Sequence, residues 1–149
     1  MRLVIILASI LTIAGCASGP KVYKFENSRS MPLSAEFVHE KASTWLAMNG
    51  FVIITKTAEL IVAQGSLNQL QGYETSAWSG VSIKTPLADC GSTGVVDFIA
   101  TDATINVITQ QTNTQAGVLV RVVMSPRRAE GTCNSNGVLE KMILDHLAN

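Results

Sequence analysis

The fold is decided by residues 34–63, which read SAEFVHEKASTWLAMNGFVIITKTAELIVA. Ser34 offers a side-chain oxygen to the amides of a first helical turn. Apolar residues then recur at the spacing of one helix face, namely Val38, Ala42, Trp45 and Leu46. Asn49 and Gly50 follow, and a glycine at this place readily adopts the positive φ that ends a helix. The stretch therefore predicts a helix that begins after Ser34 and ends at Asn49.

Two short apolar runs come next, at 51–56 and 60–63, and both are rich in β-branched residues. A short polar connection separates them, as in a β-hairpin. We therefore expect a hairpin packed under the first helix.

The rest of the chain repeats these two patterns. Strands are predicted over 94–100, 103–110 and 117–124, with a hairpin joining the last two, and 22–25 and 81–84 have the composition of short strands. Asn136 can cap a second helix, whose apolar stripe is Val138, Leu139, Met142, Ile143 and Leu147. This order predicts an α+β fold, an antiparallel sheet of about five strands with two helices packed on one face.

Length and charge limit the class of protein. The chain has 149 residues, which suits one domain, and we place that domain at 34–149. Eleven basic and eleven acidic residues give a net charge of zero. A nucleic-acid partner is therefore excluded, because binding it needs a basic face that neutralises phosphates.

The N-terminus carries a targeting signal. Arg2 precedes an apolar run over 3–13, which is too short to cross a bilayer as a helix of about 20 residues. Ile13-Ala14-Gly15-Cys16 follows, and this pattern of one aliphatic residue, two small residues and a cysteine resembles the lipobox of bacterial lipoproteins. The alternative is an ordinary signal peptide with an incidental Cys16.

The lipobox resemblance implies where the protein resides. Residues 1–15 would be removed as a signal peptide, and Cys16 would carry the lipid, with palmitate as a typical acyl chain. Ala17 and Ser18 follow the cysteine, which resembles the outer-membrane sorting class of Gram-negative envelopes. Residues 16–33 would then be a lipidated tether, and the domain would face the periplasm.

The two other cysteines, Cys90 and Cys133, would lie in an oxidising compartment, where pairing is the rule. We predict that they form a structural disulfide. A reactive thiol pair is the alternative, although neither cysteine belongs to a C-x-x-C motif.

The order of elements also resembles the small helix-grip domains of envelope lipoproteins such as BamC. The resemblance rests on a helix that ends in Asn49-Gly50-Phe51 and on the hairpin that follows it. It implies the same α+β arrangement and concerns the fold alone.

Candidate catalytic residues are few. His39 is expected on the polar side of the first helix and His146 in the last turn of the second, and neither has a partner at metal-ligand spacing. Asp89, Asp97 and Asp102 could meet across the sheet, but solvated loop carboxylates explain them more simply. We therefore predict no catalytic site, no metal and no cofactor, and a hydrolase is the weakest hypothesis.

Two other groups of residues suggest contact with a partner. Tyr73 and Trp78 lie in a polar, glycine-containing segment, where aromatic residues often anchor an interface. Folding back onto the sheet is the alternative for both. The basic residues Arg121, Arg127 and Arg128 are interpreted as charge that protects a sheet edge. Contact with anionic lipid headgroups or an acidic partner is the alternative for these three.

The leading hypothesis is a non-enzymatic lipoprotein of the outer membrane that acts as an accessory or docking subunit of a cell-envelope assembly. The expected partners are the membrane, through the lipid on Cys16, and an envelope protein. The alternative is a periplasmic lipoprotein that binds a small ligand or inhibits an enzyme, with an apolar cleft as its mark.

Overall fold

The computed structural model describes residues 19–70, 87–91, 100–126 and 132–149. Its elements follow in this order: β1 (Ser28–Met31), α1 (Ala35–Met48), β2 (Val52–Lys56), β3 (Leu60–Ser66), the 3-10 turn η1 (Leu67–Gln69), β4 (Ala88–Asp89), β5 (Ala100–Thr112), β6 (Gln115–Pro126), β7 (Asn134–Ser135) and α2 (Val138–Ala148). Two predicted strands lie outside the described ranges: the one at 81–84 entirely, and the one at 94–100 except for its last residue.

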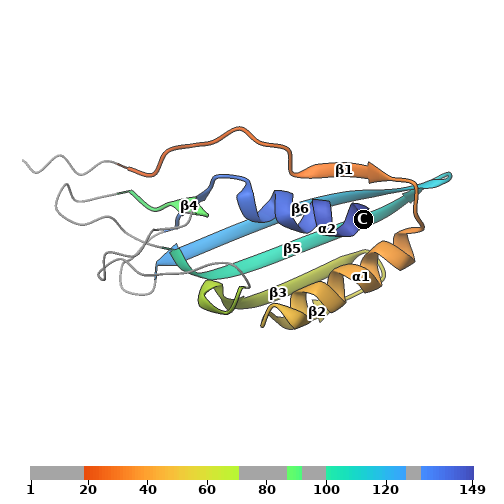
Figure 1. Cartoon of the computed structure of the whole chain (residues 1–149), viewed down its shortest axis with the longest axis horizontal. Helices are drawn as coiled ribbons and strands as arrows, with labels where there is room; N and C mark the ends of the chain where they lie inside the picture. Colours follow the sequence, from red (N-terminus) through yellow and green to blue (C-terminus); the bar gives the residue numbers. More distant parts are fainter. Residues whose placement is uncertain (1–18, 71–86, 92–99, 127–131) are drawn as a thin grey trace, which may run out of the picture.

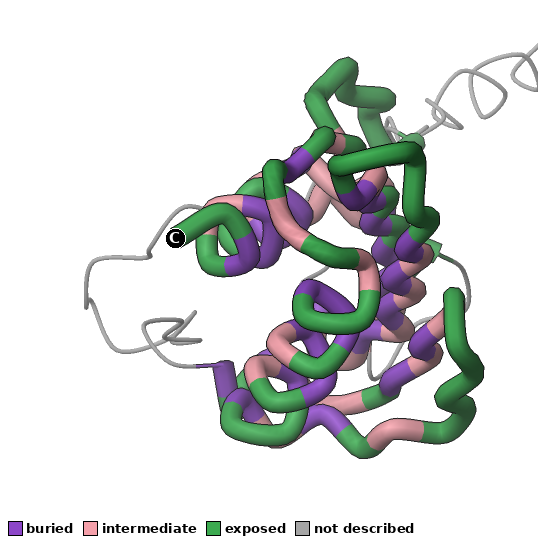
Figure 2. Tube along the Cα trace, turned by 90° about the vertical axis from the view of Figure 1, so that its right-hand side faces the viewer, coloured by how far each residue is buried: buried purple, intermediate pink, exposed green. Residues whose placement is uncertain are grey.

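Five strands form one antiparallel sheet in the order β1-β6-β5-β3-β2. The long hairpin of β5 and β6 is its centre, and both helices lie on the same side of it (Figures 1 and 2). The predicted α+β fold is therefore confirmed. β4 and β7 form a separate two-stranded sheet. Among the described residues, no helix is both long and apolar enough to cross a membrane.

The first helix forms as its sequence predicts. Ser34 Oγ accepts a hydrogen bond from the Phe37 amide at 3.3 Å, which satisfies one of the free amides of the first turn. At the other end Gly50 has a φ of +79°, and the chain turns directly into the β2–β3 hairpin. The predicted helix and the predicted hairpin are both confirmed.

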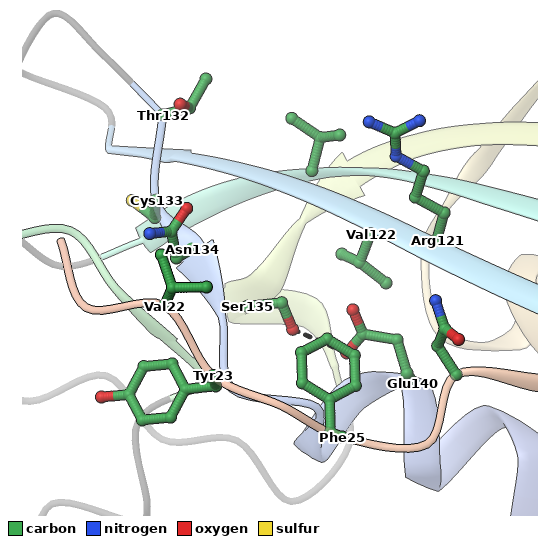
Figure 3. A pocket seen from close by; sticks show the side chains of 12 residues that line it. Val22, Tyr23, Phe25, Arg121, Val122, Thr132, Cys133, Asn134, Ser135 and Glu140 are labelled. Carbon is green, nitrogen blue, oxygen red and sulfur yellow. Dashed lines mark hydrogen bonds between the residues drawn. The ribbon is translucent and has the colours of Figure 1, made fainter.

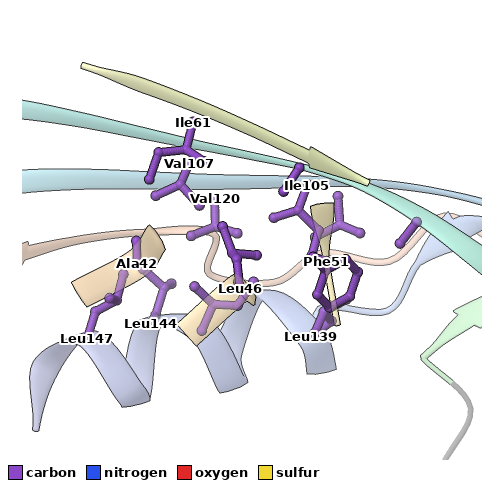
Figure 4. Packing of buried hydrophobic residues seen from close by; sticks show 14 of the residues in the cluster. Ala42, Leu46, Phe51, Ile61, Ile105, Val107, Val120, Leu139, Leu144 and Leu147 are labelled. Carbon is purple, nitrogen blue, oxygen red and sulfur yellow. The ribbon is translucent and has the colours of Figure 1, made fainter. Parts of the chain in front are cut away.

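The core lies between the sheet and the two helices (Figure 4). Alternate residues of the central strands point into it, with Ile105 of β5 paired to Val122 of β6 and Val107 paired to Val120. Leu46 of α1 has no exposed surface. Burying a side chain of this size contributes about 2 kcal/mol to folding. This apolar layer fixes the sheet that carries the polar features described below.

The N-terminal strand lies later in the chain than expected. Residues 22–25 are not a strand, whereas β1 pairs with β6 from Ser28 opposite Leu119 to Met31 opposite Ala116. Met31 is 1% exposed and belongs to the core. A buried methionine at the end of four paired residues stabilises this register, and the exposed side chains of 22–25 gain nothing comparable from pairing. The sheet therefore begins within the stretch that was expected to be a tether.

Each helix buries a face that is rotated by about one residue from the predicted stripe. The buried residues are Val38, His39, Ala42, Ser43 and Leu46 in α1, and Leu139, Glu140, Ile143, Leu144 and Leu147 in α2. The prediction that His39 lies on the polar side is wrong, because its Nδ1 lies 3.1 Å from the hydroxyl of buried Thr109. Each helix packs against both the sheet and the other helix, so its buried face is wider than its apolar stripe.

Candidate functional site

Residues 19–27, which we call the N-terminal strap, lie along the folded domain (Figure 1). The Asn134 side-chain amide donates hydrogen bonds to the backbone oxygens of Pro20 and Lys21, at 3.3 and 3.0 Å. Further along, the Val120 amide donates to the Asn27 carbonyl at 2.8 Å. The strap is therefore held at both ends by β7 and β6, although a free tether was expected here.

The middle of the strap packs against the start of α2. Gly137 precedes this helix with a φ of +87°, and a Cβ built on it would lie 2.4 Å from the ring of Phe25. Glycine is therefore required here for two reasons: it can adopt this backbone conformation, and it leaves room for the ring of Phe25. The predicted cap Asn136 stands one residue too early to be the N-cap. Its side chain still accepts a hydrogen bond from the Val138 amide at 3.1 Å.

An ion-pair group joins β1 to the end of α2. Arg29 pairs with Asp145 at 2.9 Å and with Glu26 at 3.2 Å, and Lys141 pairs with the same Asp145. Hydrogen bonds from Lys141 and Arg29 lower the pKa of Asp145, and those to Glu26 and Asp145 raise the pKa of Arg29. These charges are partly solvated, so the group sets geometry more than it adds stability.

The strap and the end of β6 enclose a pocket of about 500 Å³ (Figure 3). Its walls come from the strap, from β6, from the segment around β7 and from the first turn of α2. Phe25, Val122, Ser135 and Glu140 line it, and Arg121 lies at its rim. The pocket therefore combines an aromatic ring, aliphatic surface and one buried carboxyl group.

Glu140 is 1% exposed, although it carries a carboxyl group. The Ser135 hydroxyl donates to Oε2 at 2.7 Å, and the backbone amide of Val122 also hydrogen-bonds to the carboxylate. Burial raises the pKa of Glu140. Pairing of β1 with β6 ends at Leu119, so the carboxylate satisfies an edge amide of β6 that no strand reaches. This arrangement gives Glu140 a structural role at the wall of the pocket.

The predicted disulfide between Cys90 and Cys133 is present, and it closes the end of the pocket nearest β4 and β7. The Cys133 amide donates to the Met124 carbonyl at 2.8 Å, so the bridge also attaches to β6. Tyr23 of the strap donates to the Asp89 carboxylate at 3.3 Å. The disulfide thus stabilises the segment on which the strap is docked.

The other predicted site residues are not brought together. Cys16, Tyr73, Trp78, Asp97, Arg127 and Arg128 lie outside the described residues. Asp89 and Asp102 belong to different sheets, and each carboxylate has its own hydrogen-bond partner. His39 lies on the buried face of α1, against Thr109, whereas the His146 ring lies 6.2 Å from that of Trp45. Within the described ranges, no three residues of the metal-binding types form a group that could hold an ion.

The pocket and the docked strap were not found from the sequence. Acidic residues are common in the first turn of a helix, where the helix dipole favours a negative charge, and Glu140 occupies such a position. Its sequence position therefore gave no sign that its side chain is buried. The composition of residues 22–25 indicated a short strand instead. The signal available was the composition of this stretch, in which Lys21 and Lys24 stand beside three large apolar residues.

Comparison with protein-family models and with curated proteins finds no match to this chain.

Proposed function

We propose that the protein is a lipid-anchored, non-enzymatic docking subunit of the bacterial outer membrane, with its domain facing the periplasm. The observation that carries this proposal is the docked strap. Cys16 and Pro20 are four residues apart, and four residues span at most about 14 Å. A lipid on Cys16 would therefore hold the strap end of the domain close to the membrane surface.

Two further features support this location. The Cys90–Cys133 disulfide fits an oxidising compartment such as the periplasm. The docked strap also keeps β7 near the proposed anchor, because the chain that follows Cys16 is hydrogen-bonded to β7. A domain held close to the membrane has a raised effective concentration toward partners in the same membrane, which suits a docking role.

We place the partner contact on the face of the sheet that the helices leave free. Within the described part of the chain, a row of apolar side chains crosses the three central strands of this face, from Leu60 to Ile108 to Leu119. Leu60 and Ile108 are half-buried, and Leu119 is 37% exposed. An apolar row on an open sheet face is suited to an envelope protein with a complementary surface.

The anchor is tested by metabolic labelling. The full chain is expressed in a Gram-negative host with labelled palmitate, beside Cys16→Ala. Label on the wild type and its loss from the variant are expected. An unlabelled wild type overturns the anchor and, with it, the location.

The docking face is tested by crosslinking in living cells, followed by purification of the tagged full chain. Leu119→Lys should reduce recovery of the crosslinked partner about tenfold. Met48→Lys is the matched control, because Met48 is 73% exposed on α1, away from this face. Trp78→Ala and Tyr73→Ala test the aromatic residues in the same assay. Equal recovery with Leu119→Lys and Met48→Lys contradicts the assignment of this face.

The pocket of about 500 Å³ favours a second candidate function, the binding of a small ligand, because its volume is typical of ligand sites. Phe25 and Val122 would supply apolar contact, and Ser135 would supply a polar one. If this function holds, Phe25→Ala abolishes the stabilisation that an envelope extract gives to the purified protein in a thermal unfolding assay. A wild type that the extract does not stabilise excludes it.

A further inference from the structure

The strap exposes apolar side chains beside basic ones. Val22 is 86% exposed, Tyr23 is 40% exposed and Phe25 is 38% exposed, although all three are large and apolar. Lys21 precedes Val22, and Lys24 stands between Tyr23 and Phe25. Docking against Asn134 and Gly137 fixes the strap, so these side chains are presented by a held backbone.

Basic groups outnumber acidic ones on this surface once ion pairs are removed. Lys21, Lys24 and Arg121 form no ion pair with any described residue. Of the nearby acidic groups, Glu26 pairs with Arg29, whereas Asp89 forms no ion pair with a described residue and accepts hydrogen bonds from Tyr23 and from the Gly91 amide. The strap surface is therefore basic and apolar, which complements an anionic and amphipathic partner.

We propose that the strap lies on the surface of an anionic phospholipid bilayer, with Val22 and Tyr23 at the level of the headgroups and Lys21 and Lys24 facing lipid phosphates. This inference rests on the proposed function, which brings the strap within reach of the membrane. Tyrosine suits the interface between water and hydrocarbon, and lysine extends an apolar stem while its charge stays in water. The contact would be a second attachment, additional to the lipid on Cys16.

The lysines give the contact its dependence on lipid charge. One basic residue near an anionic bilayer strengthens attachment about fivefold. Replacing both lysines should therefore weaken the contact about 25-fold. Neutral vesicles should not support the strap contact, because they offer no anionic lipid to the lysines.

The test follows the environment of residue 22 in the reconstituted protein. The full chain with Val22→Cys is produced in a Gram-negative host, labelled with a fluorescent probe and inserted into vesicles of phosphatidylcholine, with or without phosphatidylglycerol. A probe at Asn113→Cys, in the turn between β5 and β6, is the control site. Acrylamide, a neutral quencher that the surface charge does not repel, should quench the probe at position 22 less in anionic vesicles than in neutral ones, and should quench the control probe equally in both.

A charge-matched pair of variants completes the experiment. Lys21→Gln/Lys24→Gln should restore full quenching at position 22 in anionic vesicles. Lys41→Gln/Lys56→Gln removes two positive charges from α1 and β2 and should leave the protection unchanged. Thermal unfolding of each variant verifies that the domain is intact.

The two proposals fail in different ways. Absence of palmitate on the wild type overturns the anchor. A palmitoylated protein whose probe at position 22 is quenched equally in both kinds of vesicle overturns the strap contact and leaves the anchor in place. Protection by neutral vesicles as well as anionic ones also overturns the contact, because the proposal requires anionic lipid.

Discussion

The core and the N-terminal strap differ in how they are held. Leu46 in the core is 0% exposed and is surrounded by side chains of the sheet and of α2, whereas Val22 in the strap is 86% exposed. The strap is fixed by separate contacts instead, such as the Asn134 amide on Pro20 and Lys21. Packing in a core is cooperative, but separate contacts break one at a time. Changes in the core should therefore unfold the domain, and changes near the strap should free a segment of it.

The largest effect is expected from Leu46→Ala. Removing the Cγ atom and both Cδ methyl groups from a fully buried site leaves a cavity and costs about 3 kcal/mol or more of unfolding free energy. Urea denaturation followed by circular dichroism measures it. Met48→Ala, at an exposed position of the same helix, is the control and should change stability by less than about 0.5 kcal/mol. Similar costs for the two variants would contradict the assignment of the core face of α1.

The second largest effect on stability is expected from loss of the disulfide. Replacing Cys90 and Cys133 by serine opens a loop with a sequence separation of 43 and should cost about 3 kcal/mol, because the unfolded chain gains freedom. The same denaturation experiment measures this cost. Wild type in reducing agent should match the double variant. A change below about 1 kcal/mol would mean that the bridge does not constrain the fold.

Gly137→Ala tests the strap more directly. Its φ of +87° and the 2.4 Å approach of a Cβ to Phe25 predict a cost of about 1–2 kcal/mol together with displacement of the strap. Trypsin should then cleave after Lys21 and Lys24 faster than in the wild type. Gly117→Ala is the matched control, because a Cβ there meets no atom closer than 3.7 Å. Unchanged cleavage in the Gly137 variant would show that Phe25 does not hold the strap.

The smallest effect concerns pH. Burial and the charge of Lys56 lower the pKa of His39 below its usual 6.5 in the folded protein. The unfolded chain therefore binds a proton more readily, and folding stability is lost as the pH falls through 6.5 toward the folded pKa. Burial raises the pKa of Glu140, so that group opposes the loss, gaining stability as the pH falls.

The difference between the wild type and His39→Gln isolates the histidine. The variant should lose less stability than the wild type between pH 7 and pH 5, as measured by urea denaturation at each pH. His146→Gln is a second comparison: desolvation and the charge of Lys41 also lower the pKa of His146, but its side chain is exposed, so this variant should change the pH profile less than His39→Gln does. Parallel pH profiles for wild type and His39→Gln would contradict the assignment.

Local signals in the sequence predicted most of the fold. The Ser34 cap, the Gly50 stop and the β-branched runs each depend on neighbouring residues, and all three are confirmed. The disulfide was predicted from the number of cysteines and the expected compartment, and it is present. Such features need no knowledge of distant parts of the chain.

The candidate site could not be predicted in the same way, because it depends on contacts between distant segments. His39 is buried because Thr109 offers a hydroxyl, and Glu140 is buried because Ser135 and the edge of β6 offer donors. Residues 22–25 have the composition of a strand, but the strap lies against β7 and the start of α2, and Met31 determines which residues pair with β6. Polar partners and register of this kind are set by tertiary packing.

The ion pair of Arg29 and Asp145 joins residues that are 116 positions apart. β1, which carries Arg29, is made early, and both β6 and α2 are made late. A chain that leaves the ribosome or crosses a membrane from its N-terminus therefore cannot close its sheet until nearly all of it has emerged. Contacts of such long range also slow folding. The topology thus leaves the sheet incomplete while most of the chain is being made, and the domain closes in a late step when β6 and α2 are present.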